Sequence, residues 1–389
     1  MTMIDFIKNN EKAPSKLGLY IHIPFCRTKC LYCDFCSFVS RSEGARDEYV
    51  DALVKEIEMR GTKEYLVDTI YFGGGTPSLL SVEQISRILS CVKANFIVCD
   101  DAEITLECNP RTHLDDGQKY FSALCGIGIN RLSLGVQSAV DEELKLIGRQ
   151  HTFGYAKRTF FDARESGFEN VSLDLMLGIP SQTMESLEYS VNELVKLGAE
   201  HISIYSLQLE EGTPLYKMRE KYDIADDDLS ADMYERVVYL MKNAGYEHYE
   251  ISNFARVGKE SRHNSKYWRL DEYLGLGLSA HSDFSGKRLE NTKDMAKYLS
   301  GKWVENEISI STKEREFEFL MLGLRTSAGI SKPEFFERFG VNFDEKYGKK
   351  IENLEKMGYF LQNDERVVLN ERGFEVSNML LAQILDFDY

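Results

Sequence analysis

Three closely spaced cysteines are the residues of this chain best suited to chemistry. Cys26, Cys30 and Cys33 lie in the run I-H-I-P-F-C-R-T-K-C-L-Y-C-D-F-C. The spacing C-x3-C-x2-C fits neither one face of a helix nor one face of a strand, so it predicts a short loop around one compact object. Thiolates are soft ligands, which suit zinc, copper(I) or an iron–sulfur cluster.

The choice among these metals follows from the number of ligands. Structural zinc is usually held by four ligands in two separated knuckles, and no second knuckle follows this loop. Three cysteines in one loop instead leave one iron of a 4Fe–4S cluster without a protein ligand. A set of surface thiols or a zinc loop is the alternative. Cys36, two residues past Asp34, is either a spare ligand or a bystander near the cluster.

The cysteine loop resembles that of the radical S-adenosylmethionine (SAM) superfamily. The resemblance implies that SAM chelates the open iron. It also implies that the reduced cluster passes one electron to SAM, which yields a 5′-deoxyadenosyl radical. A second motif, Gly73-Gly74-Gly75-Thr76-Pro77, follows the apolar run Ile70-Tyr71-Phe72. Consecutive glycines let the backbone approach a ligand closely, although a tight turn is the other interpretation. The motif lacks the G-K-[ST] ending of a P-loop and resembles the superfamily's G-G-T-P motif.

Further SAM-binding residues are implied by the same resemblance. Gly74, Gly75 and Thr76 would hold the methionine amino group, and Glu107 and Asp174 would address ribose or amino groups. Gln137 and Arg149 would bind the ribose hydroxyls and the methionine carboxylate, for which the arginine fork is suited. Tyr20 and Tyr32 are expected on the adenine side, with core packing as the alternative. Each polar residue follows or ends an apolar run.

A third motif lies further along the chain. His263-Asn264-Ser265-Lys266-Tyr267-Trp268 is followed by a glycine-containing run that ends at His281. A neutral imidazole is a good iron ligand, and aromatic rings can face a porphyrin; plain packing is the alternative. The segment resembles the H-N-x-x-Y-W motif of the HemW family of heme chaperones, relatives of oxygen-independent coproporphyrinogen III oxidase. By this resemblance His263, Tyr267 and Trp268 are the candidate heme-binding residues.

Three features favour the chaperone over the oxidase. Only 25 residues precede Cys26, so the longer N-terminal segment of the oxidase is not expected. Two residues separate Cys33 from Cys36, where the oxidase has one, and the H-N-x-x-Y-W motif is present. Many chaperone sequences carry Asn in place of Cys36, which is a departure. The alternative function is oxidative decarboxylation of coproporphyrinogen III to protoporphyrinogen IX.

The elements that must position these residues follow a strand–helix rhythm from Leu17 to about Leu209. Apolar runs predict six strands, and amphipathic stretches between them predict helices, which indicates parallel βα units. A doubly wound open sheet is the alternative; the resemblance implies the partial (β/α)6 barrel of radical SAM enzymes, with its site at the carboxyl ends of the strands. Residues 252–267 read as a polar loop. We expect four parts in the chain: an N-terminal segment 1–16, a barrel core 17–210, a barrel extension with the H-N-x-x-Y-W segment 211–310, and a C-terminal α+β, winged-helix-like domain 311–389. The C-terminal domain is expected to form a wall or lid over the barrel.

Composition restricts the partners. The net charge of −16 argues against a general nucleic-acid binder. Eight cysteines with no secretory signal favour a reducing cytoplasm, and no apolar run is long enough to span a membrane, while a peripheral membrane contact stays open. The resemblance implies a 4Fe–4S cluster and SAM as cofactors, heme as cargo and apo-hemoproteins of the respiratory chain as recipients. It also implies an electron donor such as flavodoxin or ferredoxin, and a homodimer when the cluster is loaded.

Overall fold

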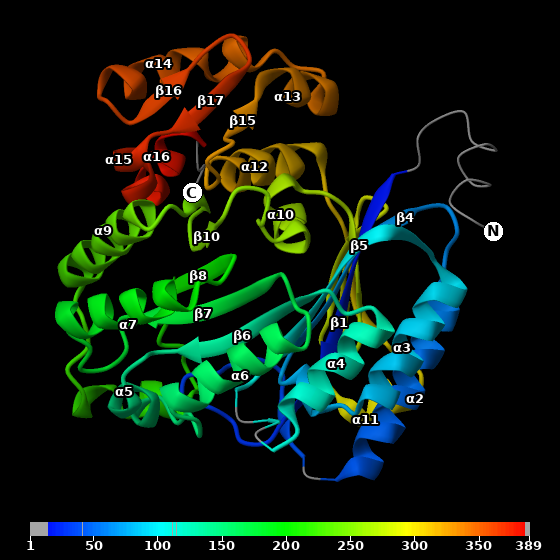
Figure 1. Ribbon diagram of the computed structural model, residues 1–389. Helices are drawn as coiled ribbons and strands as arrows, with labels where there is room; N and C mark the ends of the chain where they lie inside the picture. Colours follow the sequence, from blue (N-terminus) through cyan, green and yellow to red (C-terminus); the bar gives the residue numbers. More distant parts are fainter. Residues whose placement is uncertain (1–14, 41, 111, 114, 386–389) are drawn as a thin grey trace.

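The structure, a computed structural model, describes residues 15–40, 42–110, 112–113 and 115–385. A large α/β part carries a long, curved sheet with helices on its outer face, and a smaller part built from the C-terminal residues lies at the top of Figure 1. The large part has the parallel α/β barrel strands expected from the sequence, and a C-terminal α+β unit follows it.

Six parallel strands form the barrel and alternate with helices. Their order in the sheet follows their order in the chain, from β1 to β8. The helices begin at side-chain caps: Ser81 and Gln84 form a capping box at one of them, and Thr183 and Ser186 form another. The elements are β1 (Lys16–Ile23), α2 (Glu43–Arg60), β4 (Leu66–Gly74), α3 (Val82–Asn95), β5 (Ile97–Cys108), α4 (Gly117–Ile127), β6 (Arg131–Gln137), α5 (Asp141–Leu146), α6 (Phe153–Glu165), β7 (Val171–Leu177), α7 (Met184–Leu197) and β8 (His201–Ser206).

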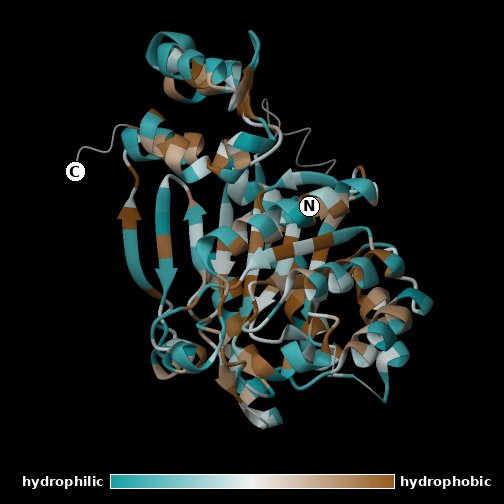
Figure 2. Ribbon diagram, turned by 90° about the vertical axis from the view of Figure 1, so that its left-hand side faces the viewer, coloured by the Kyte–Doolittle hydropathy of each residue, from teal (hydrophilic) through white to brown (hydrophobic). Residues whose placement is uncertain are grey.

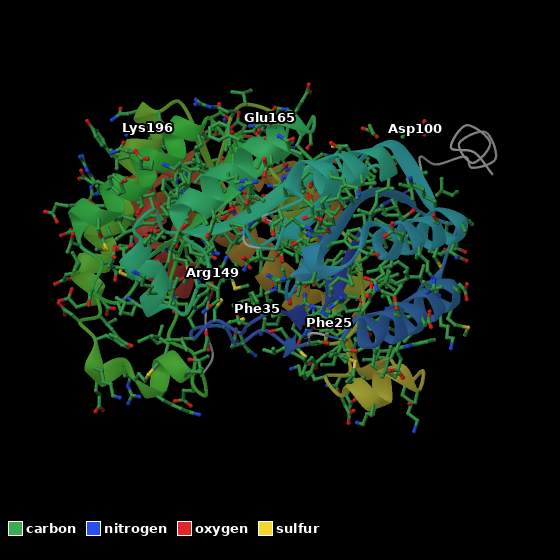
Figure 3. The ribbon with its side chains drawn as sticks, turned by 60° about the horizontal axis from the view of Figure 1, so that its bottom comes forward. Phe25, Phe35, Asp100, Arg149, Glu165 and Lys196 are labelled. Carbon is green, nitrogen blue, oxygen red and sulfur yellow. The ribbon has the colours of Figure 1, made fainter. Side chains whose placement is uncertain are left out.

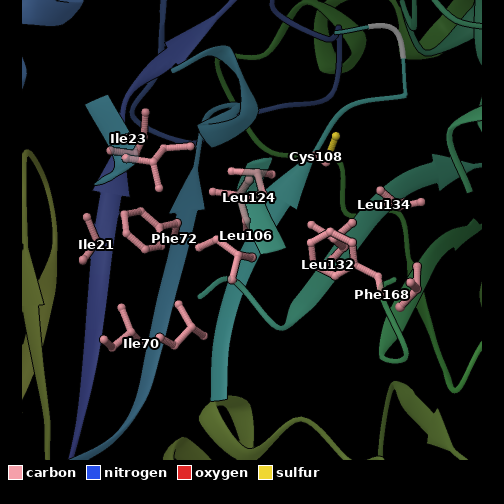
Figure 4. Packing of buried hydrophobic residues seen from close by; sticks show 14 of the residues in the cluster. Ile21, Ile23, Ile70, Phe72, Leu106, Cys108, Leu124, Leu132, Leu134 and Phe168 are labelled. Atoms are coloured by element: carbon pink, nitrogen blue, oxygen red, sulfur yellow. The ribbon is translucent and has the colours of Figure 1, made fainter. Parts of the chain in front are cut away.

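Residues alternate along each barrel strand between two environments. Ile21, Phe72, Leu106 and Leu134 are fully buried in the main hydrophobic cluster, between the strands and the outer helices (Figure 4). Their sequence neighbours point to the barrel interior because successive side chains of a strand face opposite sides. The interior set is polar: Tyr20, Tyr71, Glu107, Ser133, Asp174 and Tyr205. The alternation of side chains along the strands therefore places apolar residues against the outer helices and polar residues in the barrel interior.

The segment after β8 extends the sheet at both ends. At one end, β10 (Asn253–Ala255) and β9 (Glu247–Glu250) pair antiparallel beyond β8, next to α9 (Asp227–Asn243). At the other end, β11 (Tyr273–Leu276) pairs parallel with β1. The antiparallel strands β12 (His281–Phe284), β13 (Lys287–Asn291) and β14 (Val304–Ser309) follow it, at the left of Figure 2, and α11 (Met295–Leu299) lies between the last two in sequence.

The prediction of a polar loop at residues 252–267 is wrong. This segment contains β10 and most of helix α10 (Arg262–Arg269), which begins at Ser261, whose side chain accepts a hydrogen bond from the Asn264 backbone N–H. The helix was missed because its polar residues carry no apolar stripe: the barrel interior that receives it is itself polar.

The C-terminal unit has its own hydrophobic cluster, centred on Phe335, Ile351 and Phe360. It contains a three-stranded sheet, in agreement with the expected helices and hairpin. It lies at the end of the barrel opposite the loop that follows β1 (Figure 1), with Arg338 against the carbonyl of Leu270 just past α10. The unit that was expected as a wall or lid over the barrel therefore lies at the end away from the cysteine loop. The elements are α12 (Thr312–Gly323), β15 (Ile330–Ser331), α13 (Lys332–Phe339), α14 (Lys349–Lys356), β16 (Phe360–Gln362), β17 (Arg366–Leu369), α15 (Glu371–Glu375) and α16 (Ser377–Ile384).

None of the helices in the described part of the chain has the length and apolar content needed to span a bilayer.

Candidate functional site

The three cysteines lie in the loop between β1 and α2, at the carboxyl ends of the strands. The end of β4 anchors the start of this loop, since the N–H of Gly75 bonds the carbonyl of Ile23 at 2.9 Å and that of Thr76 bonds Phe25 at 2.7 Å. Cys26 is buried and Cys30 and Cys33 are half-buried. Figure 3 views this end of the barrel, with Phe25, Phe35 and Arg149 around its mouth.

A cavity of about 370 Å³, here called the cysteine cavity, opens beside this loop. Its volume is within the usual range of small-molecule sites. The three cysteines line it together with most of the residues expected to bind SAM. These lining residues are Cys26, Cys30, Cys33, Tyr32, Gly74, Gly75, Thr76, Glu107, Gln137, Arg149 and Asp174. The fold thus brings together motifs that are up to 148 residues apart, from Cys26 to Asp174.

Tyr20 is the exception among the predicted SAM residues. It does not line the cysteine cavity but an adjacent one, and its hydroxyl lies 3.1 Å from Nδ1 of His22. That cavity shares Gly74 and Glu107 with the cysteine cavity, and the adenine-side role of Tyr20 stays a prediction.

The glycine motif is required by close packing around the cysteine loop. Gly74 has φ of +107°, and a Cβ there would lie 2.4 Å from the His22 ring. A Cβ on Gly75 would lie 2.7 Å from the carbonyl oxygen of Phe25. Any other residue at these positions would push β4 away from the loop. The glycine motif therefore allows the end of β4 to lie close to the cysteine loop.

Two carboxyl groups face the interior beneath the cysteine loop. Glu107 accepts hydrogen bonds from the Tyr71 hydroxyl at 2.8 Å and the Gly74 N–H at 3.2 Å. Burial raises the pKa of Glu107 to about 7 despite these donors. Asp174 accepts from the hydroxyl of Ser133 at 3.0 Å, and burial raises its pKa as well. Both groups are acceptors for hydroxyl or amino donors of a ligand.

Arg149 offers the complementary donors. Its Nη1 lies 3.6 Å from Sγ of Cys30 and its Nη2 donates to the carbonyl of Gly135. Its buried Nε has no hydrogen-bond partner among the described residues. Gln137 adopts φ of +71°, and its Oε1 accepts from the Tyr205 hydroxyl at 2.8 Å. An arginine with a spare buried donor fits the carboxylate of an amino-acid ligand, so the donor set of the cavity suits SAM beside a thiolate-bound cluster.

Several lining residues were not predicted from the sequence. The missed residues are Ser133, Gly135, Met176 and Tyr205. Ser133 and Gly135 precede Gln137 on β6 at two-residue spacing, Met176 follows Asp174 by two residues on β7, and Tyr205 lies on β8. The signal was present as a two-residue alternation of polar or small residues with apolar ones. It was hidden because the strands were interpreted as apolar runs buried on both faces.

Helix α10, which carries the H-N-x-x-Y-W motif, is inserted into the amino-terminal half of the barrel. Glu103 accepts hydrogen bonds from the N–H groups of Arg262 at 3.1 Å and His263 at 3.0 Å, which places an anion at the helix N-terminus. Lys266, only 2% exposed, pairs with Asp68 at 2.8 Å. These contacts fix the helix to β4 and β5.

His263 is buried and both of its ring nitrogens are engaged. Nδ1 lies 2.9 Å from the Thr69 hydroxyl and Nε2 lies 2.9 Å from the Tyr267 hydroxyl. Burial lowers the pKa of His263 to about 3. Ligation of iron by His263 would require one of these two hydrogen bonds to be exchanged for the metal, and its role as a heme ligand stays a prediction. Tyr267 lines the adjacent cavity, whereas Trp268 is half-buried and lines neither of the two cavities.

Comparisons with known proteins point to one group. Residues 20–194 match the family model of the radical SAM superfamily, and residues 310–376 match that of the HemN C-terminal domain. The chain is 37% identical to the heme chaperone HemW of Bacillus subtilis, over 94% of this chain and 98% of that protein. It is 34% identical to the heme chaperone HemW of Escherichia coli, over 95% and 98% respectively.

A solved structure shares the fold. Coproporphyrinogen III oxidase (HemN) from Escherichia coli, described as a radical SAM enzyme, superimposes with a TM-score of 0.83. The match covers 100% of this chain and 94% of that one at 23% sequence identity.

Proposed function

Because this chain belongs to the radical SAM superfamily and, within it, to the HemW family of heme chaperones, we propose that it binds heme and delivers it to apo-hemoproteins. The 37% identity with the Bacillus subtilis heme chaperone over nearly the whole chain carries this proposal. The oxidase alternative is not carried forward, since its structural relative shares the fold at 23% identity.

Membership in the superfamily implies a 4Fe–4S cluster and SAM, and we assign both to the cysteine cavity. Cys26, Cys30 and Cys33 would hold the cluster, and a reduced cluster of this kind supplies one electron to bound SAM. Arg149 would bind the SAM carboxylate, while Glu107 and Asp174 would accept hydrogen bonds from amino or hydroxyl groups. Tyr32, half-buried over the cavity, would pack against the ligand.

The proposal also names the proteins that would interact with this chain. Respiratory apo-hemoproteins would receive heme, and flavodoxin or ferredoxin would reduce the cluster. Loading of the cluster would favour a homodimer, and a peripheral membrane contact would bring the cytoplasmic protein to membrane-bound recipients.

The test uses full-length protein with the cluster reconstituted anaerobically. Added hemin should give a stable Soret band with saturable stoichiometry, and the heme should pass to an apo-hemoprotein that regains its own spectrum. The same protein given coproporphyrinogen III, SAM and a reductant should form no protoporphyrinogen. Decarboxylation in that assay, or absence of a saturable Soret band, would overturn the proposal.

A further inference from the structure

A second cavity lies directly beside the cysteine cavity. It has a volume of about 700 Å³, and five residues, including Glu107 and Phe35, line both cavities. Its volume suits a ligand larger than an amino acid. No residue of the C-terminal unit lines it. A ligand bound there would be a direct neighbour of the ligand in the cysteine cavity.

The walls of this adjacent cavity combine aromatic faces with basic groups. Tyr267 and Tyr273 form one aromatic pair, edge to face, with ring centroids 4.6 Å apart. Phe35, from the cysteine loop, is 64% exposed and also lines the cavity. Lys29 and Lys293 also line it, beside the carboxyl residues Asp34 and Glu107. Nζ of Lys29 donates to the Phe35 carbonyl at 3.0 Å, and Lys293 pairs with Glu290 at 3.1 Å. Flat apolar faces with two cations match a planar macrocycle that carries two carboxylates.

Three histidines are candidates for contact with an iron atom in or near this cavity. His22 has both ring nitrogens engaged, with Tyr20 at 3.1 Å and the Cys36 carbonyl at 2.9 Å. His263 is engaged in the same way by Thr69 and Tyr267. His281 differs from both, because its side chain is 51% exposed and Nε2 of its ring lies 3.8 Å from a carboxylate oxygen of Glu290. That distance is beyond a hydrogen bond.

The glycine run before His281 explains its position. A Cβ on Gly275 would lie 2.1 Å from the carbonyl oxygen of His281, and Gly277 has φ of +104° with the carbonyl oxygen of His22 2.6 Å from its would-be Cβ. Glycine at both positions lets β11 turn back so that β12 begins against it. The turn holds His281 at the wall of the cavity that Cys36 also lines.

We propose that heme occupies this adjacent cavity and that His281, not His263, is the axial ligand of its iron. A neutral imidazole with an accessible nitrogen is a common heme ligand. Lys29 and Lys293 pair with the propionates, and Tyr267 packs against the macrocycle, held in place by its hydrogen bond to His263. His263 is then a positioning residue, and the H-N-x-x-Y-W motif acts through Tyr267. The assignment rests on the proposed heme-chaperone function.

The experiment titrates hemin into full-length, cluster-reconstituted wild type, His281→Ala, His281→Gln, His263→Ala and His113→Ala. His281→Ala should bind hemin about tenfold more weakly with a shifted Soret band, and added imidazole should restore the wild-type band. His281→Gln should show the same shift and rescue. His263→Ala should bind more weakly but keep the wild-type band position, and His113→Ala, outside both cavities, should match wild type.

Other results of the hemin titration would contradict either the assignment of His281 or the proposed function. An unchanged band and affinity in His281→Ala would refute His281 as the ligand. A wild-type spectrum typical of thiolate-ligated heme that is lost in Cys36→Ser would also refute His281 as the ligand. The same conclusion would follow if only His263→Ala showed a Soret shift that imidazole reverses. Failure of wild type itself to bind hemin would overturn the proposed function, and with it this inference.

Discussion

Nε2 of His263 lies 2.9 Å from the hydroxyl of Tyr267, one helical turn further along α10. The other ring nitrogen bonds Thr69 on β4, and the ring stacks on Tyr71, with centroids 5.1 Å apart. The conspicuous histidine of the motif therefore connects the inserted helix to the barrel wall and fixes a tyrosine at the edge of the adjacent cavity.

This arrangement predicts a stability defect in the absence of heme. His263→Ala removes two buried hydrogen bonds and leaves the Thr69 and Tyr267 hydroxyls without these partners. We expect the free energy of unfolding to fall by about 1–3 kcal/mol, measured by urea denaturation of heme-free protein. Tyr267→Phe, which removes one of the two bonds, should cost about 1 kcal/mol. An unchanged unfolding midpoint for His263→Ala would contradict the structural role.

The ion pair that anchors α10 predicts a larger effect. Lys266 and Asp68 are 2% and 8% exposed, so Lys266→Met leaves a buried carboxylate without its main cation. We expect a loss of about 3–5 kcal/mol in unfolding free energy. Lys16→Met is the matched control, because Lys16 lies 3.8 Å from the same carboxylate with a side chain that is 66% exposed. Equal effects of the two substitutions would contradict the assignment.

The buried carboxyl of Glu107 predicts a pH dependence. Its pKa is raised from an ordinary 4.5 to about 7 by burial, so the folded chain keeps a proton that the unfolded chain has released between these values. Stability is therefore favoured below about pH 4.5 and decreases as pH rises toward 7. Glu107→Gln should be more stable than wild type at about pH 8, by roughly 1–3 kcal/mol, and the difference should shrink in acid.

Urea unfolding at several pH values checks this prediction on ligand-free protein. Glu58→Gln, at an exposed carboxyl on α2, is the control for replacement of a carboxylate on the surface. A constant difference for Glu107→Gln across the same range would show that Glu107 titrates normally.

Cluster binding predicts a sharp division among the cysteines. Cys26→Ser, Cys30→Ser and Cys33→Ser should each lose most of the iron and sulfide after anaerobic reconstitution, because three thiolates are the full set of protein ligands in the loop. Cys36→Ser should keep its iron content, and Cys91→Ser, on α3, serves as the control away from the site. Loss of iron in Cys36→Ser would make Cys36 a cluster ligand.

Local sequence was sufficient for most elements of the barrel. Each of the six expected barrel strands is present, and helices alternate with them as the amphipathic stretches predicted. Periodicity works there because each of these elements buries an apolar face against a neighbour. It failed at α10, whose buried residues include His263 and Lys266, because the helix enters a polar interior.

The chemistry of the cysteine loop was determined by the sequence alone. Three thiols within eight residues predict one metal-binding loop, and all three line the cysteine cavity, although no three His, Cys, Asp or Glu side chains among the described residues are already arranged as a metal site. The sequence also determined the place of the glycine motif, which lies one βα unit away and must meet the loop at the carboxyl edge of a parallel sheet.

Only the tertiary structure decided the roles of the aromatic and histidine residues. His22, His263 and His281 come from β1, α10 and β12, and the partners of their ring nitrogens include residues as distant in the chain as Thr69, which lies 194 residues from His263. Sequence names residue types that can bind iron. Burial and hydrogen bonding, which arise when distant elements pack, determine which of them is still available to do so.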